Sequence, residues 1–268
     1  MPAVTDIVTA LAAAFAAATQ ASRLQANVTR TDKADGSPVT EGDLAADAAI
    51  RSVLARRCPG DAILSEEQPD DRQRLTAKRV WIIDPIDGTK EYLVGRADWA
   101  VQVALAEDGV LTLGVLAMPG LGITAVGIPG VGAWEIVDDR RKNLHCASGN
   151  NDVMIATTSP RNRPWLEKVQ AALPDFSTVL CHSIGVKTWH IIAGKAALYV
   201  HAGPLAEWDA AAPAALLLAA GGTATDLAGN PLRFNTASAL CPGVVFSRRA
   251  DHTVLIARLK QGGLGMAE

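Results

Sequence analysis

The chain has 268 residues, of which 49% are apolar and 20% are charged, a composition typical of a soluble globular protein with a sizeable core. Its net charge is −3 and its isoelectric point is about 6.0, so polymeric nucleic acid, which binds basic surfaces, is not expected as a partner. The four cysteines have neither CxxC nor zinc-site spacing, which predicts reduced thiols in a cytoplasmic protein. They are Cys58, Cys146, Cys181 and Cys241.

An alanine-rich segment predicts a first helix over residues 5–24. No basic residue precedes its apolar stretch, and its first charge is Asp6, so a signal peptide is not expected. No apolar run approaches the ~20 residues needed to cross a bilayer, so no membrane association is expected either. In the polar residues 27–38 that follow, Gly36, Ser37 and Pro38 cannot lie inside a helix and predict a loop or hairpin.

A second helix is predicted from Thr40. Thr40 and Asp43 have the spacing of a capping box, residues 45–56 have helical periodicity, and Pro59 and Gly60 end the pattern. Apolar runs then alternate with turns, which predicts strands in a largely antiparallel arrangement. These strands are predicted at residues 62–64, 79–83, 99–106, 111–118, 123–127 and 132–137.

A polar, glycine-containing stretch over residues 142–151 predicts a domain boundary near residue 148. An N-terminal α+β domain would span residues 1–147, and a C-terminal α/β domain would span residues 148–268. In the second half, predicted strands alternate with predicted helices, which favours an α/β layer architecture. The strands are at residues 153–157, 177–181, 197–201, 223–226 and 244–247, and the helices are at 163–172, 185–193, 210–220 and from about 250.

The most informative motif follows the strand predicted at residues 79–83. Asp84 and Asp87 flank Pro85, and Gly88 and Thr89 come directly after them. Two carboxylates at the end of a buried strand need a compensating cation, and a hard, oxygen-seeking ion such as Mg²⁺ suits them. Asp, Pro and Gly are also common turn formers, so an ordinary acidic turn is the alternative. Spacing alone leaves both interpretations open.

Further carboxylates lie at the ends of other predicted elements. Glu66 and Glu67 close a short strand, and an exposed loop is their ordinary interpretation. Asp209 precedes the helix predicted from residue 210 and would serve as its N-cap. Asp43 lies near the start of the second helix, where the helix dipole favours an acid. Together these residues favour an oxygen-ligand site assembled from separate elements, with Asp84 bridging two ions.

Gly88 and Thr89 add features that suit phosphate. Glycine lets a phosphate approach backbone N–H groups, and a helix starting there would favour an anion. The Thr89 hydroxyl would hold a water and, paired with Asp43, would relay its proton, although the two residues are 46 positions apart and spacing does not predict their contact. The site would carry four negative charges, which two divalent ions neutralise, and a third ion would balance a phosphate dianion. Those charges belong to Glu66, Asp84, Asp87 and Asp209.

With these residues in view, the chain resembles the inositol monophosphatase superfamily of Mg²⁺-dependent, lithium-sensitive phosphatases. WIIDPIDGT at residues 81–89 looks like its signature. Three further family blocks occur in the same order: SPVTEGD at 37–43, LSEE at 64–67 and EWDAAAP at 207–213. The resemblance covers essentially the whole chain. It implies the layered α-β-α-β-α sandwich of the inositol monophosphatase and fructose-1,6-bisphosphatase type, and a homodimer.

Three details resemble the 3'(2'),5'-bisphosphate nucleotidase branch. Lys90, Glu91 and Tyr92 stand where inositol monophosphatases more often have Thr-Asn-Phe, Glu207 stands where they often have Cys or Ile, and the loop at residues 32–38 also looks like that branch. The implied reaction is hydrolysis of 3'-phosphoadenosine 5'-phosphate to AMP and phosphate. The first alternative is inositol phosphate or another small phosphomonoester, such as histidinol phosphate or fructose 1,6-bisphosphate.

The second alternative belongs to another class: an inactive relative that binds metal and nucleotide as a sensor. Such a protein would be expected to have lost Thr89, Asp84 or Asp43, and all three are present.

The resemblance also implies which residues bind Mg²⁺. Glu66, Asp84 and the main-chain carbonyl of Ile86 would hold the first ion. Asp84, Asp87 and Asp209 would hold the second, and Glu66 would hold a weaker third ion through waters.

The remaining implied roles concern water and substrate. Thr89 and Asp43 would activate the attacking water, and Glu67 would support the site. Phosphate and substrate contacts would come from Glu66, Asp87, Gly88, Thr89 and Asp209. Lys187 is a candidate partner of the 5'-phosphate, with an exposed helix lysine as the ordinary alternative.

One departure from the family pattern lies next to Asp43. Gly42 stands where alanine is usual, and glycine inside a helix costs about 1 kcal/mol relative to alanine. The sequence therefore predicts a looser segment around Asp43.

Overall fold

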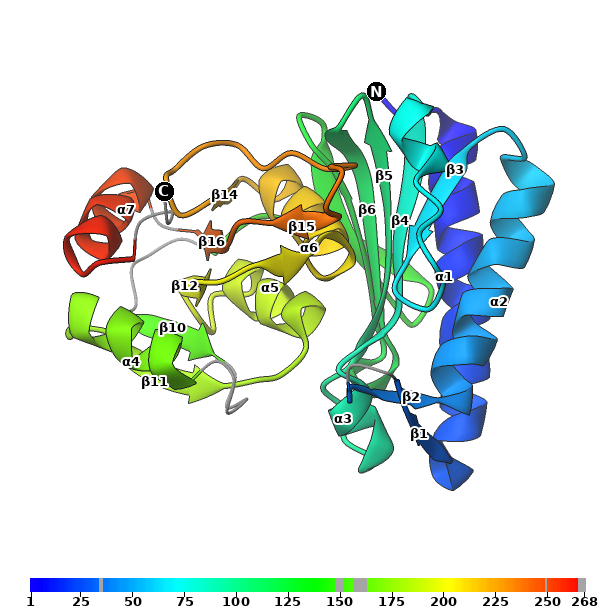
Figure 1. The fold of residues 1–268 in the computed structure, drawn as a ribbon, viewed down its shortest axis with the longest axis horizontal. Coiled ribbons are helices and arrows are strands. Elements are labelled where there is room, and N and C mark those ends of the chain that lie inside the picture. Colours follow the sequence, from blue (N-terminus) through cyan, green and yellow to red (C-terminus); the bar gives the residue numbers. More distant parts are fainter. Residues whose placement is uncertain (34–35, 148–151, 157–162, 249, 265–268) are drawn as a thin grey trace.

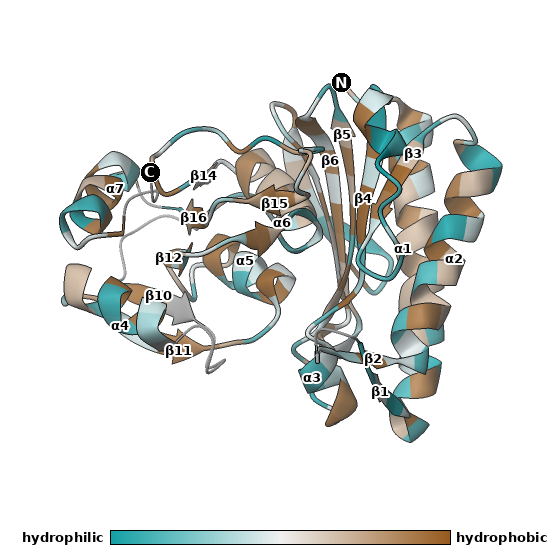
Figure 2. Ribbon diagram, viewed as in Figure 1, coloured by the Kyte–Doolittle hydropathy of each residue, from teal (hydrophilic) through white to brown (hydrophobic). Residues whose placement is uncertain are grey.

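The computed structural model describes residues 1–33, 36–147, 152–156, 163–248 and 250–264. Within these residues the chain forms five layers: two helices, a seven-stranded sheet, two helices, a five-stranded sheet and two outer helices (Figure 1). The predicted α-β-α-β-α sandwich is therefore confirmed. Apolar residues concentrate on the faces where these layers meet (Figure 2).

The seven-stranded sheet is mostly an antiparallel meander, as predicted. β3 (Ala62–Ser65) runs parallel to β4 (Arg79–Asp87), and every later strand is antiparallel to the one before it. The later strands are β5 (Ala100–Glu107), β6 (Val110–Met118), β7 (Ile123–Ile128), β8 (Gly132–Val137) and β9 (Arg140–Leu144).

Two helices, α1 (Val4–Leu24) and α2 (Glu41–Arg57), cover one face of this sheet. α1 packs through a fully buried row of alanines, namely Ala10, Ala13, Ala14, Ala17 and Ala21. Contrary to the sequence expectation, the helical stretch Val4–Asn27 is long and apolar enough to cross a membrane. Its alanine face is packed against the protein core, however, as in a core helix of a soluble protein.

Short elements surround the main layers. The 3₁₀ helix η1 (Gln25–Asn27) leads into a hairpin of β1 (Arg30–Asp32) and β2 (Pro38–Thr40), which confirms a hairpin before the second helix. η2 (Gln73–Thr76) precedes β4, α3 (Thr89–Leu93) follows it, and η3 (Pro119–Leu121) joins β6 to β7.

The second half of the chain builds the smaller sheet, in the order β11-β10-β12-β16-β14. Its first three strands are parallel, and β16 is antiparallel to both of its neighbours. The outer helices α4 (Arg163–Ala172) and α7 (His252–Gln261) pack on its outer face. The strands are β10 (Val153–Ala156), β11 (Ser177–Leu180), β12 (Leu198–His201), β14 (Thr223–Thr225) and β16 (Val244–Ser247), and a separate ribbon pairs β13 (Leu205–Ala206) with β15 (Leu240–Cys241).

Between the two sheets lie α5 (Ile184–Ile192) and α6 (Glu207–Ala219). α6 approaches the large sheet closely because two strand residues opposite each other, Gly114 and Gly127, have no side chain. A Cβ at Gly114 would lie 2.7 Å from the Ala212 carbonyl oxygen, and one at Gly127 would lie 2.5 Å from the Leu216 Cα. This packing fixes the helix that carries Asp209.

Some element ends differ from the sequence expectation. β4 continues past Ile83 to Asp87, because a register shift between Asp84 and Asp87 accommodates Pro85. β9 falls in the polar stretch that predicts a boundary, since charged side chains are acceptable on an edge strand. α6 begins at Glu207 rather than at residue 210. Thr157, at the end of a predicted strand, lies outside the described residues.

The division at residue 148 stays a prediction. Residues 148–151 lie outside the described part of the chain. One apolar core joins β4, β5 and β6 of the first half to α5 and α6 of the second.

Candidate active site

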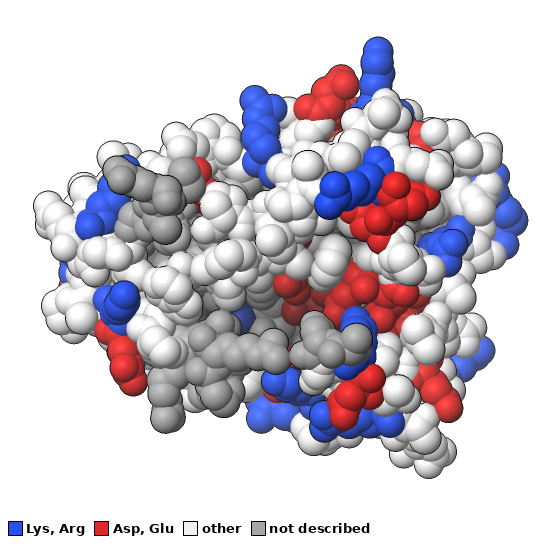
Figure 3. All heavy atoms as spheres, in the orientation of Figure 1, with Lys and Arg blue, Asp and Glu red and all other residues white. Residues whose placement is uncertain are grey.

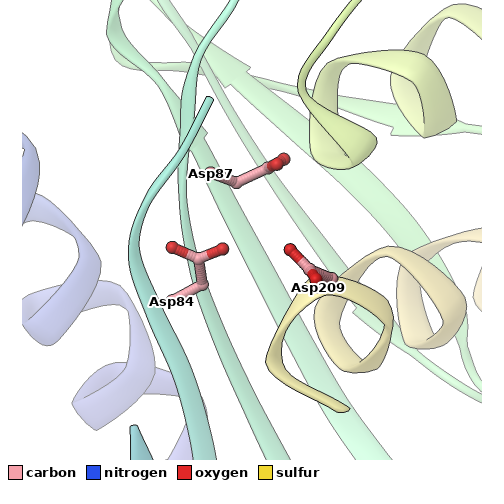
Figure 4. Close-up of side chains that lie close together, drawn as sticks. All are labelled: Asp84, Asp87 and Asp209. Carbon is pink, nitrogen blue, oxygen red and sulfur yellow. The ribbon is translucent and has the colours of Figure 1, made fainter. Parts of the chain in front are cut away.

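Three aspartates from two distant segments meet between the large sheet and α6. One carboxylate oxygen from each of Asp84, Asp87 and Asp209 lies within 4.8 Å of those of the other two (Figure 4). Asp84 and Asp87 are buried, and Asp209 is half-buried. Acidic side chains gather in a hollow near the middle of the molecular face (Figure 3). The three oxygens form a hard donor set that suits Mg²⁺.

The irregular end of β4 shapes this cluster. The Ile86 N–H donates to Asp84 Oδ1 at 3.0 Å, so the strand's own backbone fixes one side of that carboxylate. Asp84 Oδ2 is buried and has no hydrogen-bond partner among the residues that the structure describes. A buried carboxylate oxygen without a partner is costly unless a cation compensates it. The residues therefore fit a bound metal ion, and the ordinary acidic turn does not explain them.

Asp87 is held from the second half of the chain. Its Oδ2 accepts hydrogen bonds from Ser183 Oγ at 2.6 Å and from the Gly185 N–H at 2.8 Å. Ser183 is the N-cap of α5 and also accepts from the Val186 N–H. Sequence reasoning assigned Ser183 no defined role, and its position just before a predicted helix was the available signal.

Asp209 lies in the first turn of α6, where Ala206 is the N-cap, so the alternative of Asp209 as an N-cap is wrong. Glu207, two residues earlier, is fully buried and faces the loop that contains Asn235 and Thr236. Its carboxylate accepts from the Asn235 N–H at 2.7 Å and from the N–H and hydroxyl of Thr236 at 2.8 and 2.6 Å. Glu207 thus anchors the start of the helix that presents Asp209.

Asp43 and Thr89 meet although they are 46 positions apart. Thr89 Oγ1 lies 3.2 Å from Asp43 Oδ1 and 3.2 Å from the Ile86 carbonyl oxygen, and it can donate to either. Asp43 Oδ2 accepts from the N–H and hydroxyl of Thr40, the N-cap of α2. The predicted capping box is therefore confirmed, and it orients the carboxylate toward Thr89.

Glu66 and Glu67 form the neighbouring part of the site. The backbone of Glu66 pairs with β4 beside Asp84, since its N–H donates to the Ile83 carbonyl oxygen. Lys33 Nζ, from the segment after β1, lies 2.9 Å from a carboxylate oxygen of each glutamate. These contacts exclude a simple solvated loop. Sequence reasoning gave Lys33 no role, although it lies in the branch-like loop.

Asp47 is a second residue that sequence reasoning missed. It lies one turn after Asp43 on α2 and is buried. Its carboxylate accepts from Ser65 Oγ at 2.7 Å and from Gln68 Nε2, and it thereby anchors the turn that carries Glu66 and Glu67. The i, i+4 spacing of two aspartates on one helix was the signal that could have identified it.

Lys187 is 1% exposed, so the alternative of an exposed helix lysine is wrong. Its Nζ donates to the His182 carbonyl oxygen at 2.8 Å and lies 4.5 Å from the centre of the Tyr199 ring. Burial lowers the pKa of Lys187, and the nearby Asp87 carboxylate opposes that change. In this conformation Lys187 lies in the interior near Asp87 and does not reach the surface.

Burial raises the pKa of each carboxyl group in the aspartate cluster. For Asp84 and Asp209, neighbouring carboxylates add to the effect of burial and raise the pKa well above its ordinary value. The hydrogen bonds from Ser183 and Gly185 moderate the increase in the pKa of Asp87. Burial also raises the pKa of Asp43, and it raises the pKa of Glu67 to about 7 despite the hydrogen bond from Lys33.

These pKa changes predict that Mg²⁺ stabilises the protein more at high pH. A raised pKa means that the folded state binds more protons than the unfolded state, so the metal-free protein loses stability as pH rises above about 4, the ordinary aspartate pKa. We expect Mg²⁺ to raise the melting temperature more at pH 8 than at pH 5, measured by thermal denaturation with NaCl of equal ionic strength as the control. An equal or larger increase at pH 5 would contradict this electrostatic description.

The comparisons with known proteins agree on one family. The Inositol monophosphatase family profile matches residues 3–263. A Mycobacterium leprae protein named 3'-phosphoadenosine 5'-phosphate phosphatase is 38% identical over 224 residues, which cover 82% of this chain and 81% of the relative. The Escherichia coli K12 protein named 3'(2'),5'-bisphosphate nucleotidase CysQ is 32% identical over 203 residues, which cover 75% of this chain and 81% of the relative.

Solved structures share the fold. CysQ from Bacteroides thetaiotaomicron, described as a bacterial member of the inositol monophosphatase family, has a TM-score of 0.76 and 26% identity, with 91% of this chain and 97% of that chain covered. A Thermotoga maritima IMPase has a TM-score of 0.80 and 22% identity, with 97% and 98% covered.

Proposed function

Because the chain belongs to the inositol monophosphatase family, we propose that it is a Mg²⁺-dependent phosphomonoesterase that hydrolyses 3'-phosphoadenosine 5'-phosphate to AMP and phosphate. The observation that supports this chemistry is the aspartate cluster, in which the buried Asp84 Oδ2 has no hydrogen-bond partner in the described part of the chain. The names of the relatives at 32–38% identity support the substrate. So do the branch-like residues Glu91, Tyr92 and Glu207.

Two ions are proposed to bind tightly and a third more weakly. Glu66, Asp84 and the Ile86 carbonyl would hold the first. Asp84, Asp87 and Asp209 would hold the second, and Glu66 would hold the third through waters. Bound Mg²⁺ would neutralise the phosphate charge and lower the pKa of water. Lys33 now contacts Glu66 and Glu67, so its ammonium would shift when an ion occupies the site beside Glu66.

The proton path uses the pair formed by Thr89 and Asp43. As the attacking water gives its proton to Thr89 Oγ1, Thr89 passes its own proton to Asp43 Oδ1. Burial raises the pKa of Asp43, which makes its carboxylate a better proton acceptor. The water attacks phosphorus in line, the bond to the 3' oxygen breaks, and that oxygen takes a proton from solvent. No phosphorylated enzyme forms.

The phosphate is proposed to lie beside the turn between β4 and α3. Gly88 has a φ of 100°, and a Cβ at this position would lie 3.1 Å from the Asp98 carbonyl oxygen. Glycine therefore permits both this turn and its close approach to the backbone of Asp98. Asp87, Glu66 and Asp209 would reach the phosphate through the ions, and Glu67 supports Glu66 through their shared contact with Lys33.

The wider assignments follow the same resemblance. We propose a cytoplasmic, lithium-sensitive homodimer that acts on a small phosphorylated substrate. The second half of the chain would supply Asp209 and the contacts to the nucleoside. From its buried position Lys187 would favour the 5'-phosphate through its charge. A direct contact with that phosphate would require α5 to move.

A panel of substrates tests the proposed activity. We expect kcat/KM for 3'-phosphoadenosine 5'-phosphate to exceed that for inositol 1-phosphate, histidinol phosphate and fructose 1,6-bisphosphate by at least about tenfold, which corresponds to about 1.4 kcal/mol of transition-state binding. Release of phosphate with purified protein and saturating Mg²⁺ measures it. An equal or higher value for inositol 1-phosphate would replace the proposed substrate with the alternative. Absence of turnover with Mg²⁺ bound would favour the sensor.

A further inference from the structure

The ring of Tyr92 fills the space that a side chain at Gly42 would need. A Cβ built on Gly42 would lie 2.3 Å from the Tyr92 hydroxyl oxygen, 2.7 Å from Cζ and 2.8 Å from Cε1. Gly42 lies in the first turn of α2 without a positive φ, so its backbone would accept alanine, which is the better helix former. The glycine is therefore explained by the ring against it, and not by the backbone.

The Tyr92 ring cannot readily withdraw from this position. Its side chain is fully buried, and its hydroxyl donates to the Ala21 carbonyl oxygen in α1 at 2.7 Å. Trp99 packs edge-to-face against it, with ring centroids 5.1 Å apart and planes at 83°. Gln25 Nε2 donates to the Tyr92 carbonyl oxygen at 3.2 Å. The ring is thus fixed on several sides, and α2 must leave room for it.

This contact lies beside the pair that transfers the proton. Gly42 precedes Asp43 on α2, and Tyr92 follows Thr89 by three residues on the five-residue α3. The two helices therefore meet twice: at the hydrogen bond between Thr89 and Asp43, and at the ring of Tyr92 against Gly42. The second contact sets how closely the first turn of α2 approaches α3.

We propose that Tyr92 is a positioning residue for Asp43 and Thr89, and that Gly42 leaves room for the Tyr92 ring because it has no side chain. Tyr92 touches neither the reacting water nor the substrate. It acts by holding α3 against α2 so that Thr89 Oγ1 and Asp43 Oδ1 remain within hydrogen-bond distance. This inference rests on the proposed function for its catalytic consequence, whereas the contact itself is independent of that function. The contact also gives Gly42 a different role from the one expected from the sequence. Gly42 accommodates a fixed ring, whereas the sequence predicted that it loosens the segment around Asp43.

Gly42→Ala tests this proposal. We expect kcat to fall about 10- to 100-fold, because a misplacement of about 1 Å can cost on the order of 100-fold. KM and the Mg²⁺ concentration for half-maximal activity should change less than about threefold, since Gly42 and Tyr92 are not among the proposed metal or phosphate contacts. Destabilisation of the fold alone would lower the melting temperature without lowering kcat per folded molecule. Gly60→Ala is the matched control, since a Cβ there would meet no atom within 4 Å from the described residues beyond its chain neighbours.

The second substitution tests the contact by compensation. Tyr92→Phe removes the nearest atom and the hydrogen bond to Ala21, so the ring is able to withdraw. Tyr92→Leu removes all three close atoms. In the Gly42→Ala background, one of these changes should recover at least about fivefold in kcat and part of the lost melting temperature. The melting temperatures, measured without Mg²⁺, give a readout independent of activity.

The outcomes separate the two proposals. Wild-type kcat and melting temperature in Gly42→Ala would overturn the positioning role, as would losses that neither Tyr92→Phe nor Tyr92→Leu reduces. If Gly42→Ala does not fold, the double variant with Tyr92→Leu decides, because all three close atoms are then absent. An inactive wild-type protein would refute the proposed function alone, and the melting temperatures would still test the contact.

Discussion

Replacing Asp84 with asparagine is expected to lower phosphate release by at least about 10³-fold. Asp84 belongs to the aspartate cluster, and its buried Oδ2 has no partner within the described chain. Asparagine keeps an oxygen for the Ile86 N–H but replaces the other carboxylate oxygen and removes the negative charge. A loss of about 4 kcal/mol of charge stabilisation in the transition state gives this factor.

The fold of Asp84→Asn should remain intact. Burial and neighbouring carboxylates raise the pKa of Asp84, so its charge is unfavourable in the metal-free protein and its removal should not lower the metal-free melting temperature. Mg²⁺ should no longer raise that temperature by the wild-type amount. Asp71→Asn is the matched control, since Asp71 is exposed. Near-normal turnover in Asp84→Asn would refute the metal assignment.

Removing the Thr89 hydroxyl or the Asp43 charge is expected to lower kcat by about 10²- to 10⁴-fold, the usual contribution of a positioned proton acceptor. In Asp43→Asn, an amide oriented to accept from Thr40 presents its NH₂ group to Thr89. The Thr89 hydroxyl would then accept from the amide and donate to the Ile86 carbonyl instead. The proton path would be interrupted while the fold is retained.

Conservative variants make this prediction specific. Thr89→Ser keeps the hydroxyl and should retain activity within about tenfold of wild type, whereas Thr89→Ala should not. Thr76→Ala is the control, because the Thr76 hydroxyl makes an exposed contact with the Gln73 carbonyl. Single-turnover kinetics would separate the chemical step from product release. Retention of more than a tenth of kcat in both Thr89→Ala and Asp43→Asn would exclude their proposed role.

Much of the fold was predictable because local signals agreed with the packing. The alanine periodicity of α1, the Thr40 and Asp43 capping box of α2 and the alternating strands all have local causes. Errors arose where tertiary contacts override local preference. Pro85 would normally end a strand, yet a register shift lets β4 continue to Asp87. The charged residues of β9 were interpreted as part of a domain boundary, although they form an edge strand.

The site was predictable only in part, for a physical reason. Acidic residues at element ends predicted where oxygen ligands gather, but spacing could not show which ends meet. Asp43 and Thr89 come together because α3 docks on α2, a contact between separate segments. Ser183 and Lys33, which contact proposed ligands, and Asp47, which contacts Ser65 in the neighbouring turn, also act across long separations in the chain. The catalytic roles of all these residues remain predictions for mutagenesis.

The identity of the released phosphate tests the proposed function most directly. The protein is stripped with a chelator, supplied with 3'-phosphoadenosine 5'-phosphate with or without Mg²⁺, and its products are separated chromatographically. We predict AMP and inorganic phosphate in equal amounts with Mg²⁺ and no detectable product without it. Adenosine 3'-phosphate as the product, or equal hydrolysis in the absence of Mg²⁺, would contradict a metal-dependent 3'-phosphatase.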